Sequence, residues 1–245
     1  MYIYGRNAVL EALTQGQARS VLLAQGLSKG SIKEIEKLAQ GKNISIRFVP
    51  RIELDQLLKT TNHQGIVADL PEMTFADPEA PMQLAESRGE RLLLVLLDQI
   101  NDPRNYGAII RSAEVLGAHG VITEERRSAP LSAVAVKASA GASSYLPIVQ
   151  VKNLARYIAD LKQNNVWIYG AAVDNAQPPH RFDWDRDVGL VIGSEGTGLR
   201  KIIRDSCDDF VSIAMKGKIK SLNASVAAGI LIHSIVHSRD AQASG

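Results

Sequence analysis

The chain has 245 residues, which is long for one domain and sufficient for two. Its aromatic residues are four Phe, two Trp and six Tyr, so aliphatic side chains and alanine must form most of the core, as in α/β proteins. The formal net charge of +2 does not by itself indicate a nucleic-acid-binding protein. The single cysteine, Cys207, excludes an intrachain disulfide or a cysteine-based zinc cluster, and we expect it to be a small, partly buried residue.

No segment of the sequence has the pattern of a signal peptide or of a membrane span. The first residues lack a long apolar run, and the longest such run, Leu92–Leu97, has the length of a strand. We therefore expect a cytoplasmic protein that does not enter a membrane.

The first 70 residues alternate between helical and strand-like patterns, which predicts a compact α/β domain. Apolar residues recur at helical spacing in three segments, Arg6–Leu13, Ser31–Gln40 and Arg51–Lys59. Strands are predicted at Ser20–Ala24, Ile44–Val49 and Gly65–Leu70. These 70 residues carry nine Lys or Arg and six Asp or Glu, an excess of positive charge that favours RNA contact at this end of the chain.

Residues 71–90 are rich in proline and polar residues and are predicted to form a linker with room for one short helix. A second domain, residues 91–245, follows. Its first apolar run, Leu92–Leu97, is typical of a central parallel strand that is covered on both faces. Further strands are predicted at His119–Ile122, Tyr145–Val151, Val166–Val173, Val188–Gly193 and Phe210–Met215, and a final helix at Ser221–Arg239.

Three polar segments follow strand ends in this second domain, where parallel sheets usually bind ligands. In the middle one, Ile192–Leu199, the residues Gly193, Gly196 and Gly198 allow the backbone to approach a ligand closely. The spacing is not GxGxxG, and Glu195 would repel a pyrophosphate, which argues against a dinucleotide or P-loop site. The pattern suits a ligand without phosphates, although a tight strand-to-helix turn with a solvated glutamate is the alternative.

The other two segments place polar side chains at predicted helix starts. In Asp98–Gly117 these are Asn105 and, six residues later, Arg111; in Ile219–Ile230 they are Ser221 and Asn223. Both starts have simpler interpretations, with Asn105 or Ser221 as a helix cap and Arg111 as a surface charge. In the last segment, Ser221 and Asn223 together with free backbone amides would also make a ligand-facing rim. Asn105 and Arg111 lie on different faces of an ideal helix and can converge only if Asn105 belongs to the loop.

Read in order, the segments NDPRNYGAIIRSAEVLGA, GLVIGSEGTGL and SLNASVAAGILIHSI resemble motifs one, two and three of the SPOUT methyltransferases in the TrmH branch. The N-terminal segments IYGRNAVLEAL and HQGIVA are similar to the substrate-binding domain of RlmB-type enzymes. The resemblance covers nearly the whole chain and is weakest in the linker. One departure is Tyr106, where many relatives carry a Leu-like or a His residue, and it affects no catalytic position.

The resemblance implies a fold and a partner. The C-terminal domain would be an α/β sheet whose last segment threads a loop to form a deep trefoil knot, and residues 1–70 would be a small α/β RNA-binding domain like those of ribosomal proteins. Within it, residues such as Arg6, Lys33 or Lys37 would contact RNA phosphates, although for each one taken alone a solvated surface charge is the favoured interpretation. The enzyme would be a homodimer with its active site at the subunit interface.

The resemblance also implies a site. S-adenosyl-L-methionine would be bound by Gly193, Gly198, Ile213 and Leu222, and the catalytic positions would be Asn105, Arg111, Glu195, Ser221 and Asn223. Arginine is a poor base, so Arg111 would bind the target nucleotide and stabilise the developing alkoxide, with Glu195 orienting it. Asn105 and Asn223 would fix the loops and the nucleotide. No metal is expected, since the sequence contains no HExxH motif, paired cysteines or carboxylate cluster.

The activity implied is methylation of a ribose 2′-hydroxyl in RNA, with a guanosine of 23S ribosomal RNA as the expected target. A tRNA target is the alternative, and a non-catalytic ribosome-associated RNA-binding protein is another. A nicotinamide-dependent oxidoreductase would need GxGxxG after the first strand of the second domain, and NDPRNYGA does not supply it.

Overall fold

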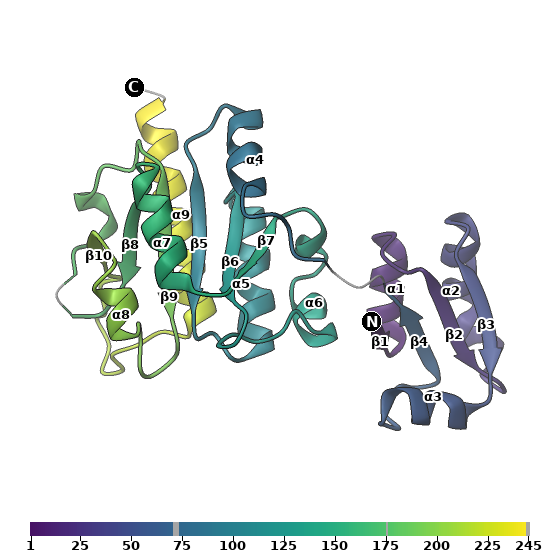
Figure 1. Cartoon of the computed structure of the whole chain (residues 1–245). Coiled ribbons are helices and arrows are strands. Elements are labelled where there is room, and N and C mark those ends of the chain that lie inside the picture. Colours follow the sequence, from purple (N-terminus) through teal and green to yellow (C-terminus); the bar gives the residue numbers. More distant parts are fainter. Residues whose placement is uncertain (71–73, 175, 244–245) are drawn as a thin grey trace. The chain divides into compact units, whose positions relative to one another are not determined.

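The computed structural model describes residues 1–70, 74–174 and 176–243 and divides the chain into two units, Met1–Thr74 and Phe75–Gly245 (Figure 1). Unit 2 thus begins within the predicted linker of residues 71–90, of which residues 71–73 lie outside the described residues. Helix α4 (Ala80–Arg88) occupies most of the rest, and its buried Pro81 and Ala85 pack on unit 2. From residue 75 the segment is therefore part of the second folded unit rather than a linker.

Unit 1 is a four-stranded sheet with helices. Its strands are β1 (Tyr2–Tyr4), β2 (Ser20–Ala24), β3 (Ser45–Val49) and β4 (Ile66–Asp69), in the order β1-β4-β2-β3. Only β2 and β3 are parallel. The helices are α1 (Arg6–Thr14), α2 (Lys29–Gly41) and α3 (Arg51–Leu58), close to the predicted segments. Strand β1 was not predicted; it is short and forms because Ile3 is buried beside β4.

Unit 2 is built on a six-stranded sheet in which every pairing is parallel. Its strands are β5 (Leu93–Asp98), β6 (Gly120–Glu124), β7 (Ile148–Val151), β8 (Trp167–Ala171), β9 (Val188–Gly193) and β10 (Asp209–Val211). They lie in the order β10-β8-β9-β5-β6-β7. All six were predicted, because strands covered on both faces are recognisable as short apolar runs.

Helices cover both faces of this sheet (Figure 1). Residues of β5 alternate between two cores: Leu93 and Leu97 face α5 (Pro103–Val115), α6 (Ala133–Ala138) and α9 (Ala224–Ala243), whereas Leu94 and Leu96 face α4, α7 (Leu154–Gln163) and α8 (Lys201–Arg204). Unit 2 is therefore a three-layer α/β/α structure with β5 at its centre. The predicted final helix, Ser221–Arg239, begins three residues later in the structure, at Ala224.

The strand order reverses direction between β5 and β9, which are neighbours in the sheet. The chain leaves β5 toward β6 on one side, and it leaves β9 toward β10 on the other. Their last residues, Asp98 and Gly193, are register partners, so the two following segments start side by side at the carboxyl edge. Such a switch point leaves a crevice between diverging loops, and this is where open α/β sheets bind ligands.

Among the described residues, no helix is both long enough and apolar enough to cross a membrane.

Candidate active site

The segment after β9 folds back on itself as a tight loop. Ser194 and Gly198 exchange two backbone hydrogen bonds, of 3.2 and 3.0 Å, and Gly196 and Gly198 have φ values of 88° and 67° that favour glycine. A Cβ atom on Gly193 would lie only 2.4 Å from the carbonyl carbon of Gly198. The glycines are therefore required for the loop to close.

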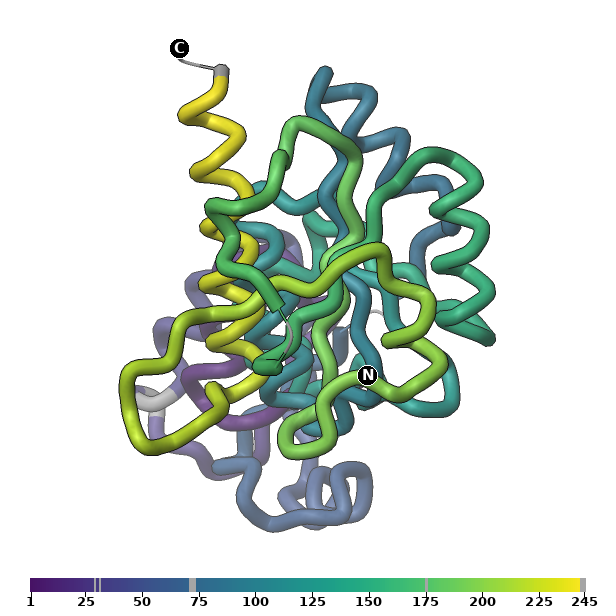
Figure 2. The backbone as a smooth tube through the Cα atoms, turned by 90° about the vertical axis from the view of Figure 1, so that its left-hand side faces the viewer, coloured from purple at the N-terminus to yellow at the C-terminus, as the bar shows by residue number. Residues whose placement is uncertain are grey.

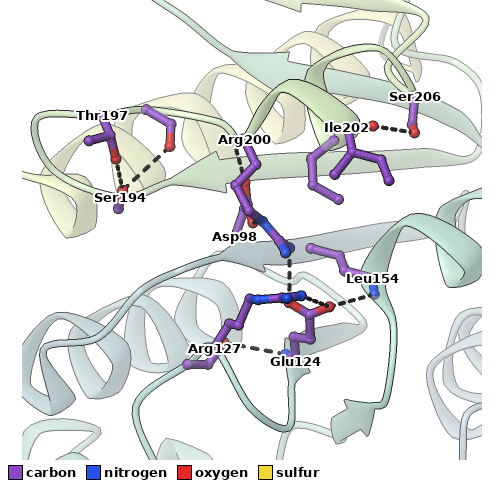
Figure 3. A network of polar contacts seen from close by, with 12 residues as sticks. Asp98, Glu124, Arg127, Leu154, Ser194, Thr197, Arg200, Ile202 and Ser206 are labelled. Atoms are coloured by element: carbon purple, nitrogen blue, oxygen red, sulfur yellow. Dashed lines mark hydrogen bonds and ion pairs between the residues drawn. The ribbon is translucent and has the colours of Figure 1, made fainter.

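This loop is anchored by Arg200, which follows it directly. The backbone N–H of Arg200 donates to Asp98 Oδ2 at 2.7 Å, and the guanidinium Nε donates to the other oxygen of this buried carboxylate (Figure 3). Arg200 Nη2 lies 2.9 Å from Glu124 Oε2, as a charge contact without hydrogen-bond alignment. Arg200 thus ties the loop to the ends of β5 and β6.

Sequence reasoning missed Asp98, Glu124 and Arg200 as a site-building group. A signal was present, since each carboxylate ends an apolar strand and the arginine follows the glycine loop. Charged residues at such buried positions require partners.

Glu195, at the tip of the loop, joins the three predicted motifs. Its Oε1 atom accepts hydrogen bonds from Asn105 Nδ2 at 2.8 Å, from Asn223 Nδ2, and from the backbone N–H of Ala224 at 3.2 Å. Asn223 Nδ2 also lies 2.9 Å from Asn105 Oδ1. The carboxylate sits at the N-terminus of α9, where the helix dipole stabilises negative charge. The alternative of a merely solvated Glu195 is therefore wrong.

The helix caps differ from those that the simpler interpretations assigned. Asp102 caps α5 by accepting from Arg104 N at 2.8 Å, so Asn105 is not the cap and its side chain is available to Glu195. At α9 the cap is Asn223, whose Oδ1 accepts from Ser225 N at 2.9 Å and from Val226 N at 3.3 Å. The alternative that Ser221 caps this helix is therefore also wrong.

A cavity of about 340 Å³ opens beside this loop. It is bounded by the carboxyl ends of β8 and β9, by residues 213–222 and by α9. Its lining includes six of the predicted site residues: Gly193, Glu195, Gly198, Ile213, Ser221 and Leu222. Leu199, Val211 and Leu231 contribute apolar side chains to the lining, and Asp174 contributes a carboxylate. The volume and the mixed lining are those of a small-ligand site.

The structure does not bring every predicted residue to the cavity. Arg111 lies six residues after Asn105 on α5, about 9 Å further along the helix axis. It is exposed, and within the described part of the chain its guanidinium makes no hydrogen bond or ion pair. Glu195 therefore contacts the two asparagines rather than orienting Arg111, which corrects that expectation. Tyr106 is on the buried face of α5, and burial raises the pKa of its phenol.

No group of three or more His, Cys, Asp or Glu side chains in the described ranges could hold a metal ion.

A cavity at the carboxyl edge of a parallel sheet, walled by a glycine loop, defines an open α/β protein that binds a small ligand at its strand switch point. Comparison with known proteins is more specific. The model of the SpoU rRNA Methylase family matches residues 92–233, and a model described as RNA 2′-O ribose methyltransferase substrate binding matches residues 2–75.

Full-length relatives agree. YacO of Bacillus subtilis (strain 168), whose name places it in the TrmH family of tRNA/rRNA methyltransferases, is 36% identical over 98% of this chain and 96% of its own length. The crystal structure of the SpoU methyltransferase AviRb from Streptomyces viridochromogenes, in complex with AdoMet, has a TM-score of 0.73 at 27% identity and covers 98% of this chain and 91% of that one. This chain belongs to the SpoU rRNA methylase family, which confirms the resemblance drawn from its motifs and the SPOUT fold expected of it; the trefoil knot stays a prediction.

Proposed function

We propose that the protein transfers a methyl group from S-adenosyl-L-methionine to a ribose 2′-hydroxyl of RNA, with a guanosine of 23S ribosomal RNA as the target. Family membership supports the reaction class. The site assignment rests on the hydrogen bonds of Glu195. One of its carboxylate oxygens joins three segments that are far apart in the sequence, and they meet beside one cavity. AviRb, a related SpoU methyltransferase, was crystallised with this cofactor.

The residues around the cavity fit S-adenosyl-L-methionine. The apolar side chains Leu199, Ile213 and Leu231 suit the faces of an adenine, and Gly193 lets the Gly198 backbone close against it, which shapes the loop that walls the cavity. The carboxylates of Glu195 and Asp174 on the lining complement a positively charged ligand rather than a phosphate. When bound, this cofactor supplies an electrophilic methyl carbon on a sulfonium.

The remaining catalytic work falls to side chains of the chain. Asn105 and Asn223 are held by Glu195 and fix the loops beside the cavity, while Ser221 lies on the rim where a ribose would enter. Arg111 would bind the target phosphate and stabilise negative charge on the 2′-oxygen, because its high pKa makes it unsuitable as a base.

We further propose that the enzyme is a homodimer in which Arg111 of a second copy completes each site. Two exposed features of the helices that carry the motifs support this. Arg111 is exposed and does not line its own cavity, and large apolar side chains of the same two helices are exposed, with Val115 69%, Val226 49% and Ile230 39% accessible. Helices α5 and α9 pack together at Ser112 and Gly229. The exposed side chains of Val115, Val226 and Ile230 are within one helical turn of this contact.

Complementation between two inactive subunits tests this arrangement. A purified heterodimer of Arg111→Ala and Glu195→Ala subunits, each carrying a different affinity tag, contains one intact site if Arg111 acts across the interface. We expect such a heterodimer to recover about half of the wild-type activity, whereas both homodimers stay inactive. A heterodimer as inactive as the homodimers would show that Arg111 serves its own subunit, and an active Arg111→Ala homodimer would show that Arg111 has no catalytic role.

The reaction and the target are tested by mapping ribose methylation in total RNA from cells with and without the gene. Loss of one 2′-O-methylguanosine in 23S ribosomal RNA is the expected result. Loss of a tRNA methylation instead would support the alternative target. Unchanged RNA methylation, together with no heat of binding for S-adenosyl-L-methionine in calorimetry, would support a non-catalytic RNA-binding protein.

A further inference from the structure

The segment between β10 and α9 contains a run of basic residues, Lys216–Lys220, that we call the basic loop. It holds Lys216, Lys218 and Lys220 within five residues, and all three are exposed. In the described part of the chain, none of them makes a hydrogen bond or an ion pair. Figure 2 shows this part of the chain as a wide yellow-green loop that leads into the final helix.

The residues on either side of the basic loop belong to the cofactor cavity. Ile213 and Met215 line the cavity before it, and Ser221 and Leu222 line it afterwards. A group bound by the basic loop must therefore lie next to the proposed methyl donor. This position distinguishes the three lysines from the other exposed cations of the unit.

Arg104 adds a further exposed cation to this side of the cavity. Arg104 is exposed in the first turn of α5, next to Asn105, which is hydrogen-bonded to Asn223 at the start of α9. The nearby carboxylate of Glu195 is held by three neutral N–H donors on its Oε1 and, among the residues that the structure describes, forms no ion pair with these cations. Unpaired cations in such a position favour a polyanion as the ligand.

An apolar side chain stands among the lysines. Ile219 is 79% exposed, the highest value among the large apolar side chains described as exposed. An apolar group flanked by cations matches a strand of nucleic acid, in which bases alternate with a charged backbone. Four Cα–Cα steps allow the basic loop to span at most about 14 Å, enough to contact two successive phosphates.

We propose that the basic loop binds the target RNA at the entrance to the active site. Lys216, Lys218 and Lys220 contact phosphates beside the target nucleotide, and Ile219 packs against a base. This inference rests on the proposed function, and it assigns to the catalytic unit a part of RNA binding separate from unit 1. It predicts that changes in the basic loop weaken RNA binding without weakening cofactor binding.

The test compares RNA and cofactor binding in the full-length protein. The variants are Lys216→Gln, Lys218→Gln and Lys220→Gln, singly and together, a triple Lys→Arg variant, and Ile219→Ala. RNA affinity is measured by filter binding with ribosomal RNA and, separately, total tRNA from cells lacking the gene, between 50 and 200 mM KCl. Affinity for S-adenosyl-L-methionine is measured by calorimetry without RNA. Arg88→Gln is the matched control, since Arg88 is exposed on α4 at the opposite edge of the sheet.

We expect the triple Gln variant to lose about ten-fold in RNA affinity at 100 mM salt and to reduce the slope of log K against log[KCl] by about 2. The triple Arg variant should retain both. Ile219→Ala should weaken RNA binding about five-fold with an unchanged slope, because it removes no charge. Cofactor affinity should stay within about two-fold of wild type in every variant, and Arg88→Gln should leave RNA binding unchanged.

Three results would overturn the proposal. The triple Gln variant could bind RNA as wild type does, with the same slope. Cofactor affinity could fall as much as RNA affinity, which would make the basic loop a wall of the cavity only. The triple Gln variant or Ile219→Ala could sediment as a monomer in analytical ultracentrifugation where the wild-type protein is a dimer, which would assign the basic loop to the subunit interface. If the wild-type protein methylates neither RNA, the proposed function fails, but the binding comparison still decides the role of the basic loop.

Discussion

Arg200 offers the sharpest test of how the site is held together. It lies between two buried carboxylates: the Asp98 side chain is 0% accessible and that of Glu124 is 3%, while that of Arg200 is 19%. Replacing Arg200 with Met keeps much of the side-chain volume but leaves both carboxylates without their cation. Removing one partner of a buried ion pair costs about 3–5 kcal/mol.

The structure places the expected loss near the lower end of that range. Asp98 keeps the backbone N–H of residue 200 as a donor, and Glu124 keeps the backbone N–H of Leu154 at 3.3 Å and the Arg127 guanidinium at 3.6 Å. We therefore expect Arg200→Met to lower the free energy of unfolding of unit 2 by about 3 kcal/mol. For a unit of this size the melting temperature should fall by roughly 6–12 °C.

Both tryptophans of the chain, Trp167 and Trp184, lie in unit 2, so tryptophan fluorescence during thermal and urea unfolding follows this unit alone. Arg127→Met is the matched control. It removes the other arginine that contacts Glu124, but that guanidinium is 57% exposed, so the loss should stay below about 1 kcal/mol. Equal losses in the two variants, or a loss below about 1 kcal/mol for Arg200→Met, would refute the assigned role of the buried cluster.

The anchoring role predicts an effect on the ligand as well. Arg200 directly follows the glycine loop, and lysine would keep its charge but not its fork geometry. We therefore expect Arg200→Lys to weaken binding of S-adenosyl-L-methionine even at temperatures well below the melting transition of the variant. A variant with lower stability but unchanged cofactor affinity would show that Arg200 stabilises the fold without positioning the loop.

Three further predictions concern other groups. Gly193→Ala should lower cofactor affinity more than ten-fold in calorimetry, because its Cβ would lie 2.4 Å from the backbone of Gly198, whereas Gly30→Ala, which meets no atom within 4 Å, should not. Burial lowers the pKa of His119 below its ordinary 6.5, so the neutral form is favoured in the fold. The stability it contributes is present above about pH 6.5 and is lost as the pH falls, and His119→Gln should flatten the fall in melting temperature between pH 7 and 5.5; a parallel fall in both proteins would contradict this. Burial raises the pKa of the Cys207 thiol to about 12, so at pH 8 a thiol reagent should modify it only after urea unfolding, and rapid labelling of the native protein would be inconsistent with that burial.

The secondary structure of unit 2 was predictable because its central strands are covered on both faces and form short apolar runs, as Leu92–Leu97 does. The exceptions have physical reasons. Strand β1 is too short to carry a periodic signal and exists through its pairing with β4. Helix α4 lies in a proline-rich segment and is ordered by packing of Pro81 and Ala85 on unit 2.

By itself the sequence determined the local chemistry of the site: glycines where the backbone must close, amide side chains at two helix starts, and a carboxylate in a loop that excludes phosphates. Only the tertiary structure decided which of these groups meet. Glu195 forms hydrogen bonds with Asn105 and Asn223 rather than with Arg111. Asp98, Glu124 and Arg200 form a buried cluster, and the sequence indicates that such buried charges need partners but not which ones they have. The reason is that side-chain hydrogen bonds act over about 3 Å, whereas the partners are up to 118 residues apart, so only the order of strands in the sheet brings them within reach.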